Sequence, residues 1–219
     1  MQFEKDYFED LEYSQREHLV KRHILDVLRW GTKESNLDLL NGKDKRALDV
    51  GCAYGYAVEV LSSLGYDVCG VDLSKYGTQK ARNRMGTANL AVTDVQKGLP
   101  FRKGVFDLAT CFDVLEHLRD PIRAIKNIYF CCRSVMIYTT PNRMVEKPFR
   151  RLMRDLDATH INVRSPSEWE SSFHDNLQCS LVQVDSFIDV NLRVRDRLLF
   201  FKSLSLPYFG LDVRIVVRR

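Results

Sequence analysis

The sequence has no long hydrophobic run and no internal repeat. A stretch such as residues 198–201 is far shorter than the roughly 18 apolar residues that a membrane-spanning helix needs. No basic patch leads into an apolar segment near Met1, so we expect no secretory signal peptide. These absences predict a soluble, cytoplasmic protein that has no transmembrane segment and could contact a membrane only at its surface.

Paired-cysteine motifs are also missing. The six cysteines form no CxxC pair, and only Cys131 and Cys132 are adjacent. This spacing fits neither a structural zinc site nor a disulfide framework. We therefore expect reduced, mostly buried thiols and no bound metal.

Charge is unevenly distributed although its sum is small. The chain of 219 residues has a formal net charge of +4 and is 45% hydrophobic, as expected for a packed globular protein. Basic residues gather in segments 143–154 and 191–219, so the rest of the chain is net acidic. The basic segments alone are weak evidence for a nucleic-acid partner.

Strand-like and helix-like segments alternate through the middle of the chain. A capping-box pattern at Ser14 and Glu17 predicts a helix with an apolar face that ends at Gly31, followed by a linker over 32–45. Further helices are predicted over 54–63, 75–84, from Pro121 and over 166–173. Buried strands are predicted over 46–50, 67–72, 90–94, 106–111, 134–138 and 211–217.

This alternation predicts an α/β fold with a mostly parallel sheet covered on both faces. Ligands of such sheets bind beyond the carboxyl ends of the strands. Residues that directly follow each predicted strand are therefore the candidates for a functional site.

Three acidic residues stand at predicted strand ends. Asp49 lies near the end of the first predicted strand. The turn that follows contains Gly51 and Gly55, where glycine allows the backbone to approach a ligand closely. Asp72 ends the second strand, where a carboxylate can accept both hydroxyls of a ribose. Asp94 ends the third strand, where it can accept the exocyclic amine of a purine, with Leu73 and Val95 beside the base.

The turn favours a nucleoside joined to an amino acid over a dinucleotide. A G-x-G-x-x-G pattern would suit a pyrophosphate, but Ala53 and Tyr56 occupy its second and third glycine positions. The carboxylate of Asp49, directly before the turn, is better placed beside an ammonium group than beside a diphosphate.

The segments 47–74 and 100–121 resemble the sequence motifs of class I, Rossmann-like S-adenosylmethionine-dependent methyltransferases. The form of the second segment, and residues 139–142 and 160–173, resemble the small-molecule branch related to ubiquinone-biosynthesis enzymes. The resemblance implies a three-layer Rossmann-like methyltransferase fold with seven strands, the last antiparallel. It also implies an N-terminal helical extension over 1–45, a methyltransferase domain over 46–219 and an acceptor-side insertion over 143–173.

By this resemblance S-adenosylmethionine is the cofactor. Gly51, Cys52 and Gly55 would line its methionine and ribose portion, and Asp72 and Asp94 would hold its ribose and adenine. Cys111 and Phe112 would lie near the methionine tail. Ala53 stands where many members have glycine; we expect an ordinary φ angle there and intact cofactor binding.

The acceptor side offers two candidate catalytic histidines. His117 follows the fourth predicted strand, and His160 precedes a second capping box at Ser165 and Glu168. Either could remove a proton from an acceptor. Structural roles are the alternatives: His117 would support its loop and contact the cofactor, and His160 would bond to a helix end.

Other residues near the expected acceptor side have two readings each. Asp113 could steer an acceptor or cap the following turn. The arginines of the insertion could bind an anionic acceptor or form a solvated basic helix (Arg143, Arg150, Arg151 and Arg154). The remaining histidines are expected to be ordinary helix-surface or loop residues (His18, His23 and His174).

Segment 198–209 mixes apolar and basic residues. It could admit a lipid-linked acceptor at a membrane face, or pack on the core before the last strand. The favoured function is O-methylation of a small-molecule, glycan or lipid-linked acceptor. The alternatives are a tRNA methyltransferase, against which no RNA-binding module is recognisable, and a non-catalytic S-adenosylmethionine-binding protein.

Overall fold

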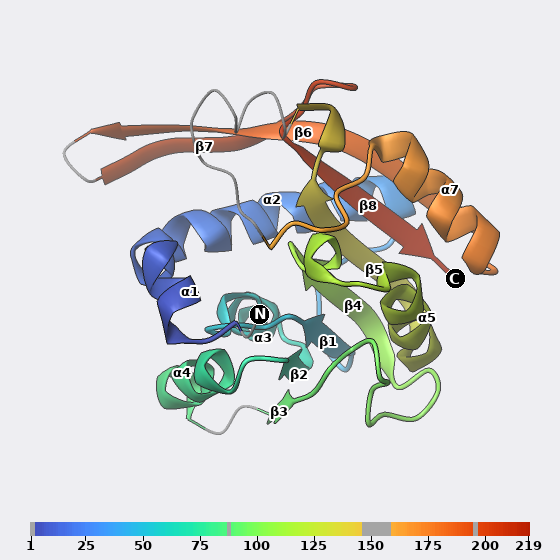
Figure 1. The fold of residues 1–219 in the computed structure, drawn as a ribbon, viewed down its shortest axis with the longest axis horizontal. Helices are drawn as coiled ribbons and strands as arrows, with labels where there is room; N and C mark the ends of the chain where they lie inside the picture. Colours follow the sequence, from blue (N-terminus) through green and yellow to red (C-terminus); the bar gives the residue numbers. More distant parts are fainter. Residues whose placement is uncertain (1–2, 87–88, 146–158, 195–196) are drawn as a thin grey trace.

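Five parallel strands form the first half of the sheet in the computed structural model, which describes residues 3–86, 89–145, 159–194 and 197–219 (Figure 1). Their spatial order is β3-β2-β1-β4-β5. All of them arise from short, mostly apolar runs, as predicted. Their bounds are β1 (Arg46–Val50), β2 (Asp67–Asp72), β3 (Asn89–Val92), β4 (Phe106–Phe112) and β5 (Cys132–Pro141).

The second half of the sheet contains three antiparallel pairings. The last strand, β8 (Asp212–Arg218), runs antiparallel to β5, which confirms that part of the prediction. The long β6 (Leu181–Val194) pairs with β8 on one side and with β7 (Arg197–Ser205) on the other.

The expected number of seven strands is wrong, because the described residues form eight. No strand was predicted within segment 198–209, but its first part belongs to the edge strand β7. It pairs with the C-terminal half of β6 as a hairpin, in which Leu192 lies opposite Phe200.

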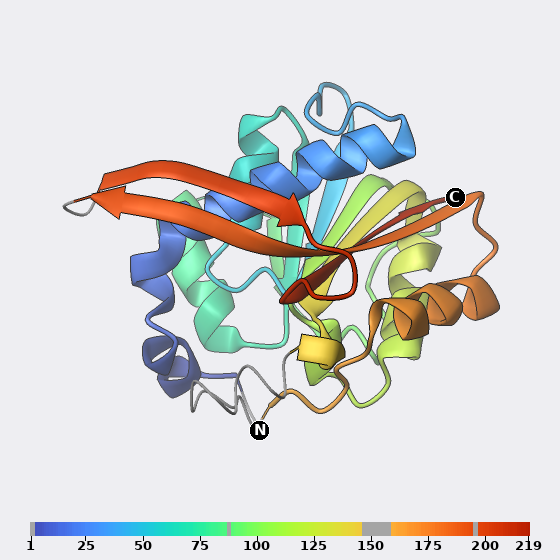
Figure 2. The same ribbon diagram turned by 90° about the horizontal axis from the view of Figure 1, so that it is seen from above.

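Helices cover both faces of the sheet (Figure 2). The described helices are α1 (Lys5–Asp10), α2 (Glu17–Ser35), α3 (Tyr56–Ser63), α4 (Lys75–Met85), α5 (Pro121–Cys131) and α7 (Pro166–Asn176), with 3-10 turns η1 (Tyr13–Arg16) and η2 (Leu115–His117).

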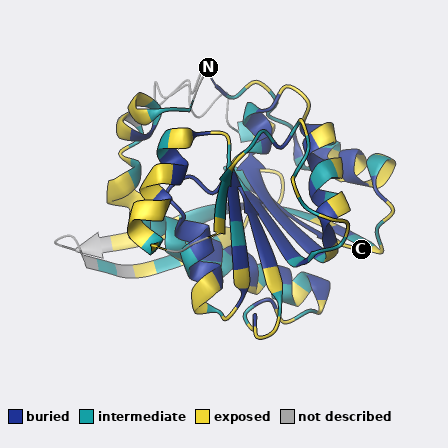
Figure 3. Cartoon of the chain, turned by 90° about the horizontal axis from the view of Figure 1, so that it is seen from below, coloured by how far each residue is buried: buried dark blue, intermediate teal, exposed yellow. Residues whose placement is uncertain are grey.

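Two hydrophobic cores lie on opposite faces of the sheet. Successive residues of a strand point to opposite faces, so Ala47 and Ile137 join α2 and α3 in one core, whereas Leu48 and Tyr138 join α5 and α7 in the other. Figure 3 shows the central strands as the buried layer between these helices. This burial holds the carboxyl ends of β1, β2 and β4 in fixed positions.

Helix α2 differs from its prediction at both ends. Ser14 lies in η1, and α2 begins at Glu17 without a side-chain cap, so the first capping box is wrong. The helix continues through Gly31 to Ser35. A Cβ atom at Gly31 would come within 2.5 Å of the Ile137 side chain, so this glycine allows close helix-to-sheet packing and does not end the helix.

The two predicted helix starts that contain a proline, at Pro121 and Pro166, are confirmed. The Asp120 side chain accepts a hydrogen bond from the backbone N–H of Arg123, with Pro121 in the first turn. At α7, the side chains of Ser165 and Glu168 each accept a hydrogen bond from the other residue's backbone N–H, which is a capping box.

The β6–β7 hairpin extends beyond the rest of the sheet in Figure 1. On one face, Asp189, Asn191 and Phe201 line a cavity. The opposite face exposes apolar side chains, among them Leu192 at 56% and Phe200 at 48%. None of the described helices is both long enough and apolar enough to cross a membrane.

Candidate active site

A cavity of about 530 Å³ lies at the carboxyl ends of β1, β2 and β4. The N-terminal residues, α2 and the β6–β7 hairpin contribute its other walls. Among its lining residues are nine of the eleven predicted cofactor-binding residues and both predicted catalytic histidines: Asp49, Gly51, Cys52, Ala53, Asp72, Leu73, Asp94, Val95, Phe112, His117 and His160. The sequence-predicted residues therefore converge on one site.

The turn after β1 adopts positive φ angles at three positions. Gly51 has φ 79°, Ala53 has φ 44° and Gly55 has φ 82°. The expectation of an ordinary φ at Ala53 is wrong. The turn directs the Ala53 N–H toward the carboxylate of Asp72, which accepts a hydrogen bond from it at 2.7 Å.

Asp72 connects β2 to this turn. Its Oδ2 accepts the N–H of Ala53 and its Oδ1 accepts the N–H of Ser74, both at 2.7 Å. Burial raises the pKa of Asp72 above its ordinary value, although these backbone hydrogen bonds act in the opposite direction. Because a carboxylate oxygen accepts more than one hydrogen bond, both oxygens retain acceptor capacity on the cavity wall.

Asp49 is buried at the end of β1, with 2% of its surface exposed. Its Oδ1 accepts a hydrogen bond from the Thr110 hydroxyl at 2.7 Å. Burial, with a contribution from the charge of Asp72, raises the pKa of Asp49 to about 7, although the Thr110 hydrogen bond lowers it. A cationic group bound nearby would favour the ionised form.

Asp94 and its neighbours form the part of the cavity beside β3. Oδ1 of Asp94 accepts the backbone N–H of Gln96 at 3.0 Å, which fixes the side chain at the turn. Val95 is buried beside it, whereas Leu73 is 47% exposed on the opposite side. A flat apolar ring could lie between these two side chains.

Two predicted cofactor residues do not line the cavity. Cys111 is fully buried within β4, and Gly55 lies behind the turn, where a Cβ would come within 2.3 Å of Met85 Cε. Phe112, one residue after Cys111, does line the cavity. Gly55 therefore serves the packing of the turn against α4.

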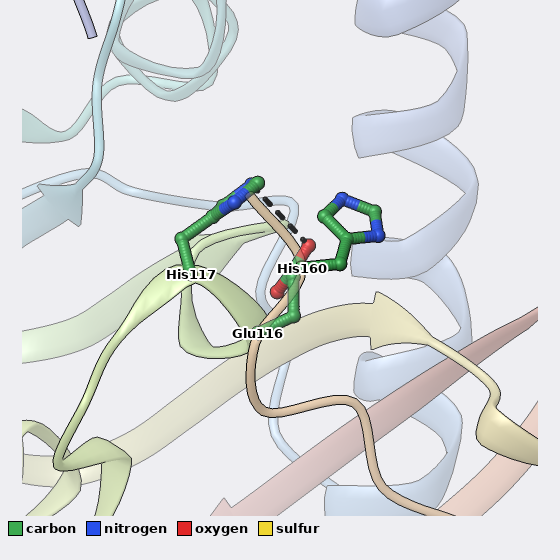
Figure 4. A group of neighbouring side chains, drawn as sticks. All are labelled: Glu116, His117 and His160. Atoms are coloured by element: carbon green, nitrogen blue, oxygen red, sulfur yellow. Dashed lines mark ion pairs between the residues drawn. The ribbon is translucent and has the colours of Figure 1, made fainter. Parts of the chain in front are cut away.

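His117 and His160 lie close together beside the buried Glu116 (Figure 4). Their ring centroids are 4.8 Å apart, and Nδ1 of His117 is 2.8 Å from the Thr159 hydroxyl. Nε2 of His117 is 3.9 Å from Oε1 of Glu116. The two histidines thus join the η2 turn to the segment that precedes α7.

Glu116 is a residue that the sequence analysis missed. Burial, and then the charge of Asp113, raise the pKa of Glu116 well above its ordinary value. Its Oε2 accepts a hydrogen bond from the Thr140 hydroxyl at 3.1 Å, but its buried Oε1 has no hydrogen-bond partner within the described part of the chain. The adjacent His117 was the available signal, because a Glu-His pair directly after a strand offers two ligand types.

These three residues could hold a metal ion. Ligand atoms of Glu116, His117 and His160 all lie within 4.8 Å of one another. Two imidazoles and a carboxylate suit zinc and similar divalent ions. The expectation of no metal stays a prediction, and this cluster is the place to test it.

Asp113 lies at the edge of the cavity with φ 53°. Its Oδ1 accepts the Thr139 hydroxyl at 2.9 Å, and η2 has no side-chain cap. The carboxylate is therefore tied to β5 and does not cap the following turn.

His23 corrects the expectation that it is an ordinary surface residue. It lines the cavity from α2, its side chain is 15% exposed, and its Nδ1 is 2.7 Å from Oδ2 of Asp189 on β6. Its position one residue before the buried Ile24 indicated the inward face of the helix. Nothing in the local sequence indicated Asp189, which is 166 residues away. His18 and His174 are exposed, as expected.

Aromatic residues of the N-terminal segment also line the cavity. Phe3 and Tyr7 contact the His117 ring edge-on, with ring centroids 5.2 and 6.2 Å away. The density of aromatic residues in segment 1–13 was the available signal for this role. The division into a 1–45 extension and a 46–219 domain stays a prediction.

The arginines expected in the insertion are only partly described. Arg143 forms an ion pair of 2.6 Å with Glu168 at the start of α7. Arg150, Arg151 and Arg154 lie outside the described residues. Arg16 is the one Lys or Arg side chain among the described residues that line the cavity.

Comparison with known proteins supports the cofactor assignment. Residues 15–183 match the model of a protein family described as a methyltransferase domain. A ubiquinone biosynthesis O-methyltransferase of Pectobacterium carotovorum is 34% identical over 103 residues, which cover 45% of this chain and 42% of that protein. One of Coxiella burnetii is 35% identical over 109 residues, covering 48% and 45%. The chain thus matches less than half the length of these curated relatives.

Solved structures of similar fold span nearly the whole chain. A possible histamine N-methyltransferase of Thermotoga maritima has a TM-score of 0.68 at 18% identity and covers 97% of this chain and 96% of its own. A methyltransferase of Archaeoglobus fulgidus has a TM-score of 0.68 at 19% identity, and the match covers 97% of this chain and 100% of that protein. Magnesium protoporphyrin IX methyltransferase of Synechocystis, solved with S-adenosylhomocysteine, has a TM-score of 0.63 at 14% identity. The match covers 98% of this chain and 97% of that protein. The chain belongs to the methyltransferase domain family, and its fold is that of the S-adenosylmethionine-dependent methyltransferases in these solved structures.

Proposed function

We propose that the chain transfers the methyl group of S-adenosylmethionine to a hydroxyl oxygen of a small molecule. One observation carries the proposal: a single cavity is lined by the three strand-end carboxylates on one side and by imidazoles on the other. The curated relatives, which are named as O-methyltransferases of ubiquinone biosynthesis, support oxygen as the accepting atom.

The residues of the first half of the sheet fit the cofactor. Asp72 would accept the ribose hydroxyls, and Asp94 would accept the adenine amine with Val95 against the ring. The partly protonated carboxyl of Asp49 would become a carboxylate beside the ammonium group. Gly51, which has no side chain, leaves room for the cofactor at the turn.

The bound cofactor would supply a methyl carbon made electrophilic by the adjacent sulfonium. The chain then has to orient an acceptor oxygen in line with the breaking carbon–sulfur bond and to exclude water. Phe112 and Val114 line the cavity beside the turn and provide apolar walls for this purpose. A hydroxyl acceptor also requires a group that removes its proton.

The lining of the acceptor side favours an acceptor with an apolar body over an anionic one. Phe3, Tyr7, Leu19 and Phe201 provide apolar surface, and Arg16 is the one Lys or Arg among the described lining residues. A prenylated or otherwise lipid-linked hydroxyl compound would bury its apolar part there. All six cysteines are free, which supports a cytoplasmic setting for the reaction.

The proposal is tested by incubating the protein with S-adenosylmethionine carrying a labelled methyl group. Separate reactions would contain catechol, 4-nitrocatechol, a prenylated hydroxybenzoate, or bulk tRNA, with Asp72→Ala as the inactive control. We expect the labelled methyl group to be attached to an ether oxygen of a small-molecule product, identified by mass spectrometry. Label in tRNA alone would favour the RNA methyltransferase, and cofactor binding without transfer would favour a non-catalytic binding protein.

A further inference from the structure

His23 and Asp189 form a pair that no predicted catalytic role includes. His23 lies on the second turn of α2 and Asp189 on β6, and both line the cavity. Their contact is 2.7 Å from Nδ1 to Oδ2. The ring of His23 lies 6.4 Å from that of Phe112, a centroid-to-centroid distance, so the imidazole is adjacent to the end of β4.

The contact fixes which ring nitrogen carries the proton. An ionised carboxylate can only accept hydrogen bonds, so Nδ1 of His23 must donate to Asp189. In the neutral imidazole Nε2 is then the unprotonated nitrogen. This Nε2 is buried and has no hydrogen-bond partner among the described residues.

The carboxylate of Asp189 is itself held in place by the edge strand. Its Oδ1 accepts the hydroxyl of Ser203, the residue opposite it on β7. The backbone N–H of Ser203 donates to Asp26 of α2 at 3.2 Å, so the hairpin is fastened to the helix that carries His23. The edge strand β7 therefore supports the pair directly.

The surrounding charges keep Asp189 ionised and favour proton uptake by His23. Burial would raise the pKa of Asp189, but the hydrogen bonds from His23 and Ser203 hold it below its ordinary value. Burial would lower the pKa of His23, but Asp189, Asp113 and Asp212 together raise it. These carboxylates come from β6, the end of β4 and β8, the elements around the ring.

We propose that His23, oriented by Asp189, is the general base that deprotonates the acceptor hydroxyl. This inference rests on the proposed function, because a general base is needed only for an acceptor that carries a proton. A base oriented by a buried carboxylate, with its second nitrogen free, is the arrangement by which enzymes activate hydroxyl groups.

Proton removal and methyl transfer occur in one step. Nε2 of His23 takes the proton of the acceptor hydroxyl while the oxygen forms a bond to the methyl carbon. The carbon–sulfur bond breaks and its electron pair stays on sulfur, which becomes the neutral thioether of S-adenosylhomocysteine. The imidazolium then releases its proton to solvent.

A purely structural role would leave different evidence. A structural pair holding α2 to the hairpin would affect folding and the binding of every acceptor alike. A base affects kcat, gives the rate a pH dependence, and matters less when the acceptor is already ionised. The experiment therefore compares acceptors that differ in acidity.

Steady-state rates would be measured with catechol and with the more acidic 4-nitrocatechol between pH 5.5 and 9. The variants are His23→Asn, Asp189→Asn and, as a control, His174→Asn on the exposed surface of α7. We expect His23→Asn to lower kcat for catechol by about 100-fold, with S-adenosylmethionine affinity unchanged. For 4-nitrocatechol at pH 8 we expect a loss below about tenfold.

The pH profile gives a second readout. The wild type should show a rate that rises through the pKa of His23, above pH 6.5, and this limb should be absent in His23→Asn. Asp189→Asn should move the limb to lower pH. Equal losses for both acceptors, or a catechol rate and pH profile unchanged in His23→Asn, would overturn the assignment of His23 as base.

Nitrogen-15 NMR of the histidine side chains tests the pair without turnover. We expect neutral His23 to carry its proton on Nδ1 and to titrate above pH 6.5. The opposite tautomer, or a lower titration midpoint, would refute the inference even if methyl transfer is observed. If no hydroxyl compound accepts the methyl group although the NMR result holds, the proposed function fails and the His23–Asp189 geometry stands by itself.

Discussion

The hydroxyl of Thr110 on β4 donates a 2.7 Å hydrogen bond to the carboxyl of Asp49 on β1, its partner in the register of the two strands. The pair lies inside the sheet, directly before the turn that faces the cavity. Without a cation nearby, burial leaves the pKa of Asp49 at about 7.

This value predicts proton release when S-adenosylmethionine binds. The ammonium group of the cofactor would lower the pKa of Asp49, so at pH 6.5 the carboxyl would lose most of one proton on binding. Affinity should rise with pH up to about 7 and then level off. Calorimetry at pH 6.5 in phosphate and in Tris should give different apparent enthalpies, and Asp49→Asn should remove the difference.

Asp49 also affects stability in the cofactor-free state. Its pKa in the folded chain lies above its ordinary value of 3.8, so the contribution of Asp49 to stability is fully present below pH 3.8 and is lost as pH rises through about 7. Asp49→Asn should therefore flatten the dependence of the unfolding free energy on pH between 5 and 8. An unchanged dependence would contradict the assigned burial of this carboxyl.

Asp72→Ala should weaken S-adenosylmethionine binding at least tenfold. The variant loses the acceptor for the ribose hydroxyls and also the bonds that shape the turn, and a charge-assisted hydrogen bond contributes roughly 1.5–3 kcal/mol. The control is Asp67→Ala at the other end of β2, where the side chain is 64% exposed. Calorimetry showing equal affinity in folded Asp72→Ala would remove this residue from the site.

Gly51→Ala should destabilise the protein and weaken cofactor binding. A Cβ at Gly51 would come within 2.2 Å of Val114, at a φ of 79°. We expect a loss of about 2 kcal/mol or more, from strain and overpacking together. Gly104→Ala is the matched control, since its φ is 64° but the nearest atom is 3.4 Å away; it should cost about 1 kcal/mol in urea unfolding.

The cluster of Glu116, His117 and His160 is the place to test the expectation of no bound metal. Its ligand atoms lie within 4.8 Å of one another, and among the described residues Oε1 of Glu116 has no hydrogen-bond partner. Under this expectation, micromolar Zn²⁺ leaves the melting temperatures of the wild type and of Glu116→Gln unchanged. A rise in the wild type that Glu116→Gln lacks would assign a zinc site to the cluster, and the same rise in both proteins would show that the ion binds elsewhere.

His160→Ala should lower turnover with little change in cofactor affinity, because His160 lies on the acceptor side of the cavity. Initial rates and calorimetry on the same preparation measure both quantities. If turnover and affinity fall together, the residue serves the structure of the cofactor site and not the acceptor.

The fold and the convergence of the strand-end carboxylates on one cavity could be predicted because their signals are local. The carboxylates Asp49, Asp72 and Asp94 each follow a short apolar run, and parallel strands bring such ends together. The Ser165 and Asp120 caps were readable for the same reason, since each is completed within three residues.

The missed features depend on contacts distant in sequence. In the sequence Gly31 resembles a helix end, but in the structure it packs against Ile137. His23 resembles a surface residue in the sequence, but in the structure it contacts Asp189 of β6. The N–H of Ala53 donates to the carboxylate of Asp72, which is 19 residues later. No spacing rule within a single segment indicates these pairings.

The close approach at Gly31 sets the depth at which α2 rests on the sheet. His23 is eight residues earlier on the same rigid rod, roughly 12 Å along its axis. A single methyl group added at position 31 would have to displace Cδ1 of Ile137 or shift the helix that carries His23 and its contact with Asp189. The absence of a side chain at Gly31 thus helps to set the position of the His23 imidazole.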